Sequence, residues 1–276
     1  MFRAVSGAAA FLICLTALYI TGCTPMDNGR SPEEYFSLAV SSLAGKEEFQ
    51  FHGMSGLRLG VSGEFHQQVH FEGKLRSHDQ LTVSTVAPAG AEMEAAASAA
   101  QTGKSGLTEN FYRLRGAWRG GTDAMAGRPG RLNPVSRLEE LGKLEKQITL
   151  EKAAPRGTRM FRIEVSDRDA KKWMSAELQK EMDDVNRRFR RLAAKQPTPE
   201  HSKLNTELNA AWKKANDELV RRLEAAQVRT VYHLTVDRRT LLPQRLSSDT
   251  HILYQDQVGG VQEESLVTDT FFRDYK

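Results

Sequence analysis

The chain has 276 residues, of which 39% are hydrophobic and 27% charged, and its formal net charge is +4. These proportions are typical of a globular protein, and they exclude a polytopic membrane protein, a collagen-like repeat and a fully disordered chain. The excess of positive charge is mild, so nucleic acid is not an expected partner. Two cysteines cannot build a disulfide-rich scaffold.

Residues 1–22 are predicted to be an export signal. Arg3 supplies a positive charge, and residues 8–20 form a weakly polar to apolar run. This run is shorter than the roughly 20 residues that a membrane-spanning helix needs, but it fits the apolar region of a signal peptide. The run ends in Ile20-Thr21-Gly22-Cys23, which resembles the lipobox of bacterial lipoproteins.

The lipobox resemblance implies that cleavage leaves Cys23 as the N-terminal residue, with its thiol linked to diacylglycerol. Cys23 would then be a lipid anchor, with palmitate-type chains, that holds the protein on the extracytoplasmic side of the cell membrane. Two acyl chains are enough for stable anchoring. The alternative is an ordinary secretory signal that happens to contain a cysteine. Residues 23–32 are interpreted as a tether.

The start of the mature chain predicts one helix followed by strands. Ser31-Pro32-Glu33-Glu34 is a helix start, and Gly45 is a plausible stop. Residues 49–51, 65–71 and 81–85 alternate apolar and polar side chains, which predicts half-buried strands. Turns or bulges are expected at five glycines, namely Gly53, Gly56, Gly60, Gly63 and Gly73.

The middle of the chain predicts a loop, short strands and a long helical hairpin. The stretch 87–107 is rich in Ala, Gly and Ser and is interpreted as a loop, and 134–144 as a short helix. Strands are expected at 110–118, 147–150 and 160–165. Apolar residues then recur every three or four positions over 167–194 and again after Pro199, which predicts two helices of about 40 Å each. We expect residues 167–227 to be an insertion between two strands, with helices that pack through their apolar stripes.

The last 48 residues predict an antiparallel meander. The stretch 231–237, followed by Arg239-Thr240-Leu241-Leu242-Pro243, resembles the strand–turn–strand of the lipoprotein-carrier superfamily (LolA/LolB/LppX-like), and the closing residues 271–275 look like its final strand. The order of elements is similar as well. This resemblance implies a curved, incomplete barrel with an apolar concave face that can hold acyl chains.

We therefore predict an α+β fold: a curved antiparallel sheet with an N-terminal helix and the hairpin as a lid, forming a single domain over residues 33–276. The expected function is binding of a hydrophobic or amphipathic ligand, such as a lipid or a lipoprotein acyl chain, without catalysis or a cofactor. The candidate cavity residues are Phe65, Phe71, Leu81, Tyr232 and Leu234. The alternative is a non-catalytic envelope scaffold whose hairpin docks a partner protein.

Several motifs carry a weaker signal. His66 and His70 lie four residues apart on a strand, about 13 Å, which is too far for one metal ion. Gly103-Lys104-Ser105 resembles the end of a phosphate-binding loop, but a flexible loop is the better interpretation. The basic residues at 187–195 would suit anionic headgroups or wall polymers, although a solvated helix face is favoured. The stripe of Trp173, Met174 and Phe189 is expected to be core.

Overall fold

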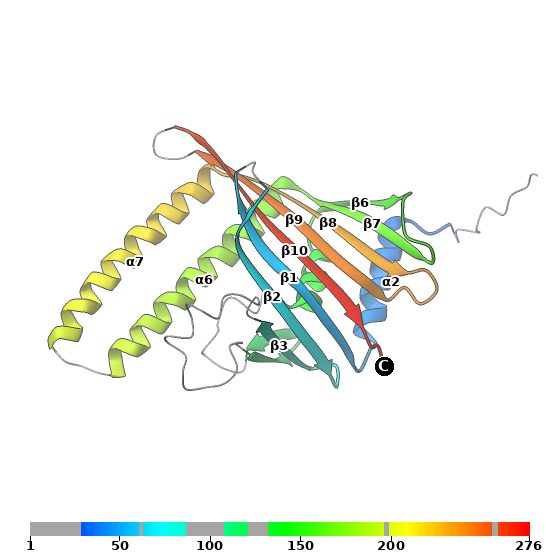
Figure 1. Ribbon diagram of the computed structural model, residues 1–276, viewed down its shortest axis with the longest axis horizontal. Helices are drawn as coiled ribbons and strands as arrows, with labels where there is room; N and C mark the ends of the chain where they lie inside the picture. The colour runs from blue at the N-terminus through cyan, green and yellow to red at the C-terminus, as the bar shows by residue number, and fades with distance from the viewer. Residues whose placement is uncertain (1–28, 61–62, 87–107, 121–131, 196–198, 256–258) are drawn as a thin grey trace, which may run out of the picture.

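The computed structural model describes residues 29–60, 63–86, 108–120, 132–195, 199–255 and 259–276. The predicted fold class is confirmed: the fold is α+β, with ten strands in one antiparallel sheet and helices packed on it (Figure 1). The strand order is β5-β4-β3-β2-β1-β10-β9-β8-β7-β6. The terminal strands β5 and β6 do not pair with each other, so the sheet is open.

The elements follow the predicted order. The strands are β1 (Phe49–Leu59), β2 (Phe65–Arg76), β3 (Gln80–Val86), β4 (Thr108–Leu114), β5 (Ala117–Gly120), β6 (Lys146–Glu151), β7 (Thr158–Val165), β8 (Gln227–Asp237), β9 (Pro243–Gln255) and β10 (Val261–Arg273). The helices are α2 (Pro32–Ala44), α5 (Pro134–Leu141), α6 (Asp167–Lys195) and α7 (Pro199–Ala225).

Helix α2 begins where the sequence predicts. The Ser31 hydroxyl accepts a hydrogen bond from the backbone N–H of Glu34, and the Glu34 carboxylate accepts one from the Ser31 N–H at 2.8 Å. This reciprocal pair satisfies two of the N–H groups that a helix start leaves unbonded. The apolar face of α2 then packs on the sheet, where the rings of Tyr35 and Phe161 lie 6.1 Å apart.

Three of the five glycines expected in turns or bulges lie in regularly paired parts of strands instead, so that prediction is wrong for them. Gly53 and Gly56 are in β1, and Gly73 is in β2. A Cβ on Gly73 would lie 2.2 Å from the Phe51 ring, and a Cβ on Gly56 would lie 2.4 Å from the ring of Phe65. Glycine is needed there because aromatic rings of the neighbouring strand occupy the side-chain space.

The turn between β8 and β9 explains the Asp–basic–Thr pattern at 237–240. The Asp237 carboxylate accepts hydrogen bonds from the backbone N–H groups of Thr240 and Arg239 and from the Thr240 hydroxyl, at 2.8–3.0 Å. These bonds, led by the one from the Thr240 N–H, lower the pKa of Asp237. The turn is therefore held by a charged acceptor, and β8, β9 and β10 form the predicted meander.

Helices α6 and α7 form a hairpin between β7 and β8, which are direct antiparallel neighbours in the sheet. The base of the hairpin packs on the sheet, and the rest extends away from it (Figure 1). At the base, Ala170, Met174, Leu223 and Ala226 are buried. Farther out, Val185 and Phe189 are exposed, so the prediction that the whole stripe is core is wrong for the outer half of α6.

Helices α2 and α5 lie on one face of the sheet, behind it in Figure 1. We call this the helix-facing surface of the sheet; the base of α6 contributes to the same core. None of the described helices is long and apolar enough to cross a membrane. The signal peptide with Cys23, the Gly103-Lys104-Ser105 motif and the expected loop over 87–107 lie outside the described residues.

Candidate functional site

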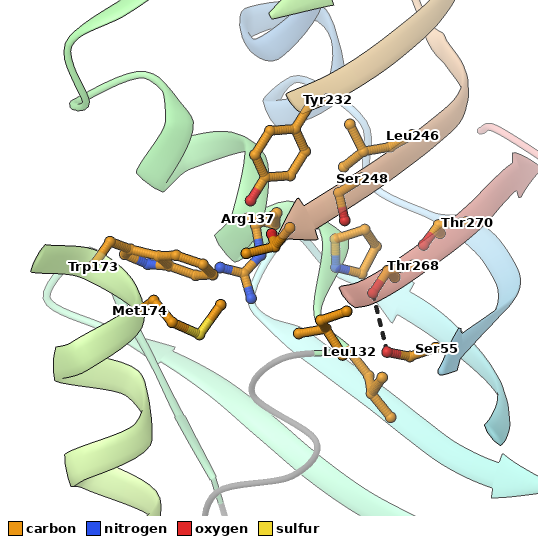
Figure 2. Close-up of a pocket in the computed structure, with 13 residues that line it drawn as sticks. Ser55, Leu132, Arg137, Trp173, Met174, Tyr232, Leu246, Ser248, Thr268 and Thr270 are labelled. Atoms are coloured by element: carbon orange, nitrogen blue, oxygen red, sulfur yellow. Dashed lines mark hydrogen bonds between the residues drawn. The ribbon is translucent and has the colours of Figure 1, made fainter. Parts of the chain in front are cut away.

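The middle of the helix-facing surface carries hydroxyl groups. Ser55 of β1 pairs with Thr268 of β10, Thr268 pairs with Ser248 of β9, and Ser248 pairs with Tyr232 of β8. The hydroxyls of Ser55 and Thr268 lie 3.0 Å apart (Figure 2). Thr250 and Thr270 flank this row and are buried. We call Ser55, Ser248, Thr250, Thr268 and Thr270 the hydroxyl patch.

The hydroxyl patch separates two apolar ends of the same surface. At one end an aromatic cluster surrounds Phe49, whose ring lies 6.3 Å from Phe51, 6.0 Å from Phe272 and 5.5 Å from Tyr275. At the other end Val228 and Ile252 are buried. The sequence predicts that this surface is apolar throughout. The structure corrects the prediction at the centre of the surface, where the side chains are those of serine and threonine.

A small pocket lies between the hydroxyl patch and the helices. Helix α5 and the residues before it contribute Leu132, Pro134 and Arg137, and helix α6 contributes Trp173 and Met174 (Figure 2). The enclosed volume is about 40 Å³. Pockets for small ligands usually have about 300–1,000 Å³. The helices therefore close this site almost completely in the described conformation.

Arg137 is the charged group of the pocket, and its side chain is only 13% exposed. The guanidinium lies 4.0 Å from the ring centroid of Trp173. Its hydrogen bond to Glu140 is long, at 3.4 Å, and no other is found among the described residues. A guanidinium has five N–H donors. Most of this donor capacity is therefore available to a hydrogen-bond acceptor that enters the pocket.

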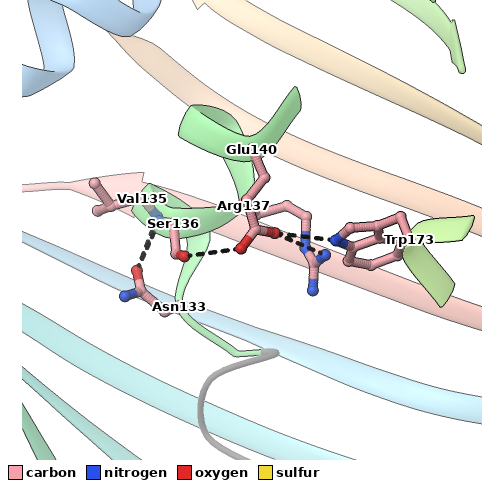
Figure 3. Close-up of polar contacts among 6 residues, drawn as sticks. All are labelled: Asn133, Val135, Ser136, Arg137, Glu140 and Trp173. Atoms are coloured by element: carbon pink, nitrogen blue, oxygen red, sulfur yellow. Dashed lines mark hydrogen bonds and ion pairs between the residues drawn. The ribbon is translucent and has the colours of Figure 1, made fainter. Parts of the chain in front are cut away.

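Glu140 holds the arginine and the tryptophan in place. Its carboxylate accepts hydrogen bonds from the Trp173 indole N–H at 3.2 Å and from the Ser136 hydroxyl at 3.3 Å (Figure 3). The same carboxylate faces the Arg137 guanidinium. One acidic side chain on α5 thus links the short helix to α6 and orients the cationic group above the hydroxyl patch.

Helix α5 is positioned by its N-terminal cap. The Asn133 side-chain oxygen accepts hydrogen bonds from the backbone N–H groups of Val135 and Ser136, at 3.0 and 3.1 Å (Figure 3). Pro134 occupies the first turn. Asn133 is 1% exposed, and its amide nitrogen has no hydrogen-bond partner among the described residues. An unsatisfied buried donor is costly, so this end of α5 has an unused polar group next to the pocket wall.

Tyr232 is the one candidate cavity residue that lines the pocket. Burial raises the pKa of its phenol, and the nearby positive charge of Arg137 acts in the opposite direction. The phenol therefore stays protonated and can donate a hydrogen bond at physiological pH. Because Tyr232 lies at the end of the row, the row of hydroxyl groups extends across four strands, from β1 through β10 and β9 to β8.

The other four candidate cavity residues do not line the pocket. Phe71, Leu81 and Leu234 are fully buried in the core. Phe65 is half-buried, and the Arg58 guanidinium lies 4.4 Å from its ring centroid. The structure therefore brings Phe71, Leu81 and Leu234, like Tyr232, into the buried core, and these three form part of its packed apolar regions.

Sequence reasoning missed Arg137, Asn133 and most of the hydroxyl patch. The patch had a detectable signal, because Ser248, Thr250, Thr268 and Thr270 fall at core-facing positions of period-two strands. Arg137 had none, since an arginine on a short amphipathic helix is usually solvent-exposed. Among the described residues, no group of three metal-binding side chains lies close enough together to hold a metal ion.

Comparison with known proteins gives weak structural similarity. No family model matches the chain, and no curated protein matches it. A LolA superfamily protein from Nitrosomonas europaea is 9% identical with a TM-score of 0.27, and the alignment covers 90% of this chain and 93% of that one. An outer membrane lipoprotein-sorting protein domain from Vibrio parahaemolyticus is 12% identical with a TM-score of 0.23, at coverages of 89% and 93%.

A DUF1329 family protein from Desulfovibrio piger gives 10% identity and a TM-score of 0.27, with 90% of this chain and 93% of that chain covered. The three alignments span most of each chain, at low identity and low TM-score. TM-scores at this level do not support an argument about function, so the functional proposal rests on the pocket itself.

Proposed function

We propose that this protein is a non-catalytic binding protein for an amphipathic ligand, which it holds between the sheet and helix α5. The observation that carries the proposal is the buried guanidinium of Arg137 opposite the hydroxyl patch. A cation with free donors and a row of hydroxyls suits a negatively charged or hydrogen-bond-accepting headgroup. The apolar regions on either side of the patch suit the hydrocarbon part.

Ligand entry requires movement of the helices. The pocket holds about 40 Å³, which is too small for an acyl chain. Helix α5 has eight residues and is anchored through the buried side chains of Val135, Leu138 and Leu141. Displacement of α5 and of the Trp173 ring would join the pocket to the neighbouring apolar part of the helix-facing surface. The described conformation is therefore the closed state of this proposal.

The cellular setting belongs to the same proposal. We infer that the mature chain begins at Cys23 and is held by a diacylglyceryl group on the extracytoplasmic side of the cell membrane. The lipobox sequence supports this inference. Replacement of Cys23 by Ser should release the protein from membranes or leave an uncleaved precursor. A Cys23→Ser protein that is still cleaved and membrane-bound would contradict the anchor.

Titration with a fluorescent fatty acid tests the ligand proposal. Arg137→Gln should weaken binding at least about tenfold, since a hydrogen bond to a charged group contributes about 1.5–3 kcal/mol. Arg159→Gln is the matched control, because Arg159 also stacks on an aromatic ring, that of Tyr35 at 4.3 Å, outside the pocket. Equal affinities of the two variants, with both proteins folded, would exclude Arg137 as the headgroup site.

A second measurement separates ligand binding from the alternative function. Organic extraction of purified protein should release a stoichiometric amphipathic lipid if the pocket is loaded in the cell. If neither extraction nor titration detects a ligand, the pocket is only a packing feature. The envelope scaffold that docks a partner through its hairpin would then be the better explanation of the fold.

A further inference from the structure

The outer half of α6 exposes apolar side chains. Val185 is 39% exposed and Phe189 is 40% exposed. They lie four residues apart and so share one face of the helix. Met174, on the same repeat nearer the sheet, is only 2% exposed. We call the described segment 185–191 the hairpin tip.

Charge along α6 is separated into two blocks. Residues 167–184 contain six acidic and four basic side chains, whereas residues 185–199 contain five basic side chains and no acidic one. Arg187 reaches back to the buried carboxylate of Asp184. Arg190, next to Phe189, is exposed. The hairpin tip is therefore cationic, although the hairpin as a whole is nearly balanced.

We propose that the hairpin tip docks on the surface of an anionic phospholipid bilayer. Basic side chains attract anionic headgroups, and an exposed aromatic ring among them can enter the boundary between headgroups and acyl chains. A hydrophilic polyanion would use only the charges and would leave Phe189 and Val185 in water. The combination of both features within one short segment of α6 favours the bilayer.

The position of the tip makes this contact independent of the predicted lipid anchor. Helix α2, which begins at Pro32, lies at one end of the molecule, and the far end of the hairpin lies at the other (Figure 1). A tether over residues 23–32 reaches at most about 35 Å from the anchor. An anchored protein that also docks through the tip would contact lipid at two separate points.

A fluorescent probe next to the tip tests the proposal in the full chain. Asn186→Cys, in a Cys14→Ser background, carries an environment-sensitive dye, and Gln244→Cys at the opposite end of the sheet is the matched position. A chain without either new cysteine corrects for labelling of Cys23. The labelled chains are mixed with vesicles that contain shallow spin-labelled lipids, either phosphatidylcholine alone or phosphatidylcholine with phosphatidylglycerol.

We expect quenching of the dye at position 186 only with the anionic vesicles, and its loss in 0.5 M salt. Arg190→Gln should lower the docking constant about fivefold, and Phe189→Ser by a similar or larger factor. The controls Arg239→Gln and Phe271→Ser should have no effect; Phe271 is also 40% exposed, but lies on β10.

Three results would overturn the proposal. The first is equal quenching at positions 186 and 244, since the probe would then report only general proximity to lipid. The second is equal quenching by neutral and anionic vesicles. The third is a response of the tip probe to soluble poly(glycerol phosphate) that equals its response to vesicles, which would identify a wall polymer or another polyanion as the partner.

Discussion

The two halves of the hairpin carry the same apolar repeat but lie in different environments. Near the sheet, Met174 and Leu223 are 2% and 6% exposed, whereas Val185 and Phe189 farther out are about 40% exposed. The amphipathic period predicts a helix and a preferred face. It does not predict what covers that face, because coverage depends on the distance from the sheet.

The largest contrast is expected when Met174 is truncated. Met174→Ala removes a fully buried side chain at the base of the hairpin, so we expect a loss of about 2–5 kcal/mol in the free energy of unfolding. Denaturant titration of the purified protein measures this loss. A change below about 1 kcal/mol would show that the hairpin base is as loosely packed as its outer half.

Trp173 should give a smaller loss, because its ring is only partly buried. The ring stacks on Arg137 and its indole N–H bonds to Glu140, so Trp173→Ala is expected to cost about 1–3 kcal/mol. Trp173→Phe keeps a ring for the stack and should recover all but the hydrogen bond. If both substitutions cost the same, the hydrogen bond rather than the stack holds α6 to α5.

Removal of the outer half of the hairpin tests whether the fold needs it. The Trp212 indole donates to the Met182 carbonyl at 3.0 Å, which ties α7 to α6 at this level. Replacement of residues 186–208 by a four-residue Gly/Asn loop keeps this contact, and loops of that length commonly join antiparallel helices. We expect a thermal midpoint within a few degrees of that of the full chain. A large drop would mean that the outer half contributes to folding.

The smallest effect is expected at the tip itself. Phe189→Ala should change the free energy of unfolding by less than about 0.5 kcal/mol, since exposed positions contribute little to stability. The same denaturant titration gives this value alongside that for Met174→Ala. A cost near that of Met174→Ala would place Phe189 in a packed contact and weaken the docking proposal.

Much of the fold follows from local patterns, and the errors have identifiable causes. Ser31 and Pro32 predict the start of α2 because capping depends on adjacent residues. The prediction for Gly73 is wrong because the role of this glycine depends on Phe51, which lies far from it in sequence and opposite it in the sheet. Arg137 could not be found for the same reason: its burial depends on α6, which comes later in the chain.

The candidate site shows the same limit. Tyr232 and Leu234 were predicted from the alternation in β8, and both face the helices as a strand periodicity requires. The hydroxyl patch exists only as a row across β1, β9 and β10, and no single strand reveals a row. Residue pairing between strands of the meander, such as Thr268 with Ser248, is set by turn length and core packing together.

An open sheet has two edge strands, and in the part of the chain that the structure describes both of them are short. β5 has four residues and β6 has six, whereas the eight strands between them have seven to thirteen. β5 carries Arg119, and β6 begins with Lys146 and ends with Glu151. Short, charged edges offer few unpaired backbone groups to another chain. The sheet can thus remain unclosed, as the proposed ligand-holding surface requires, with little tendency toward edge-to-edge aggregation at high local concentration.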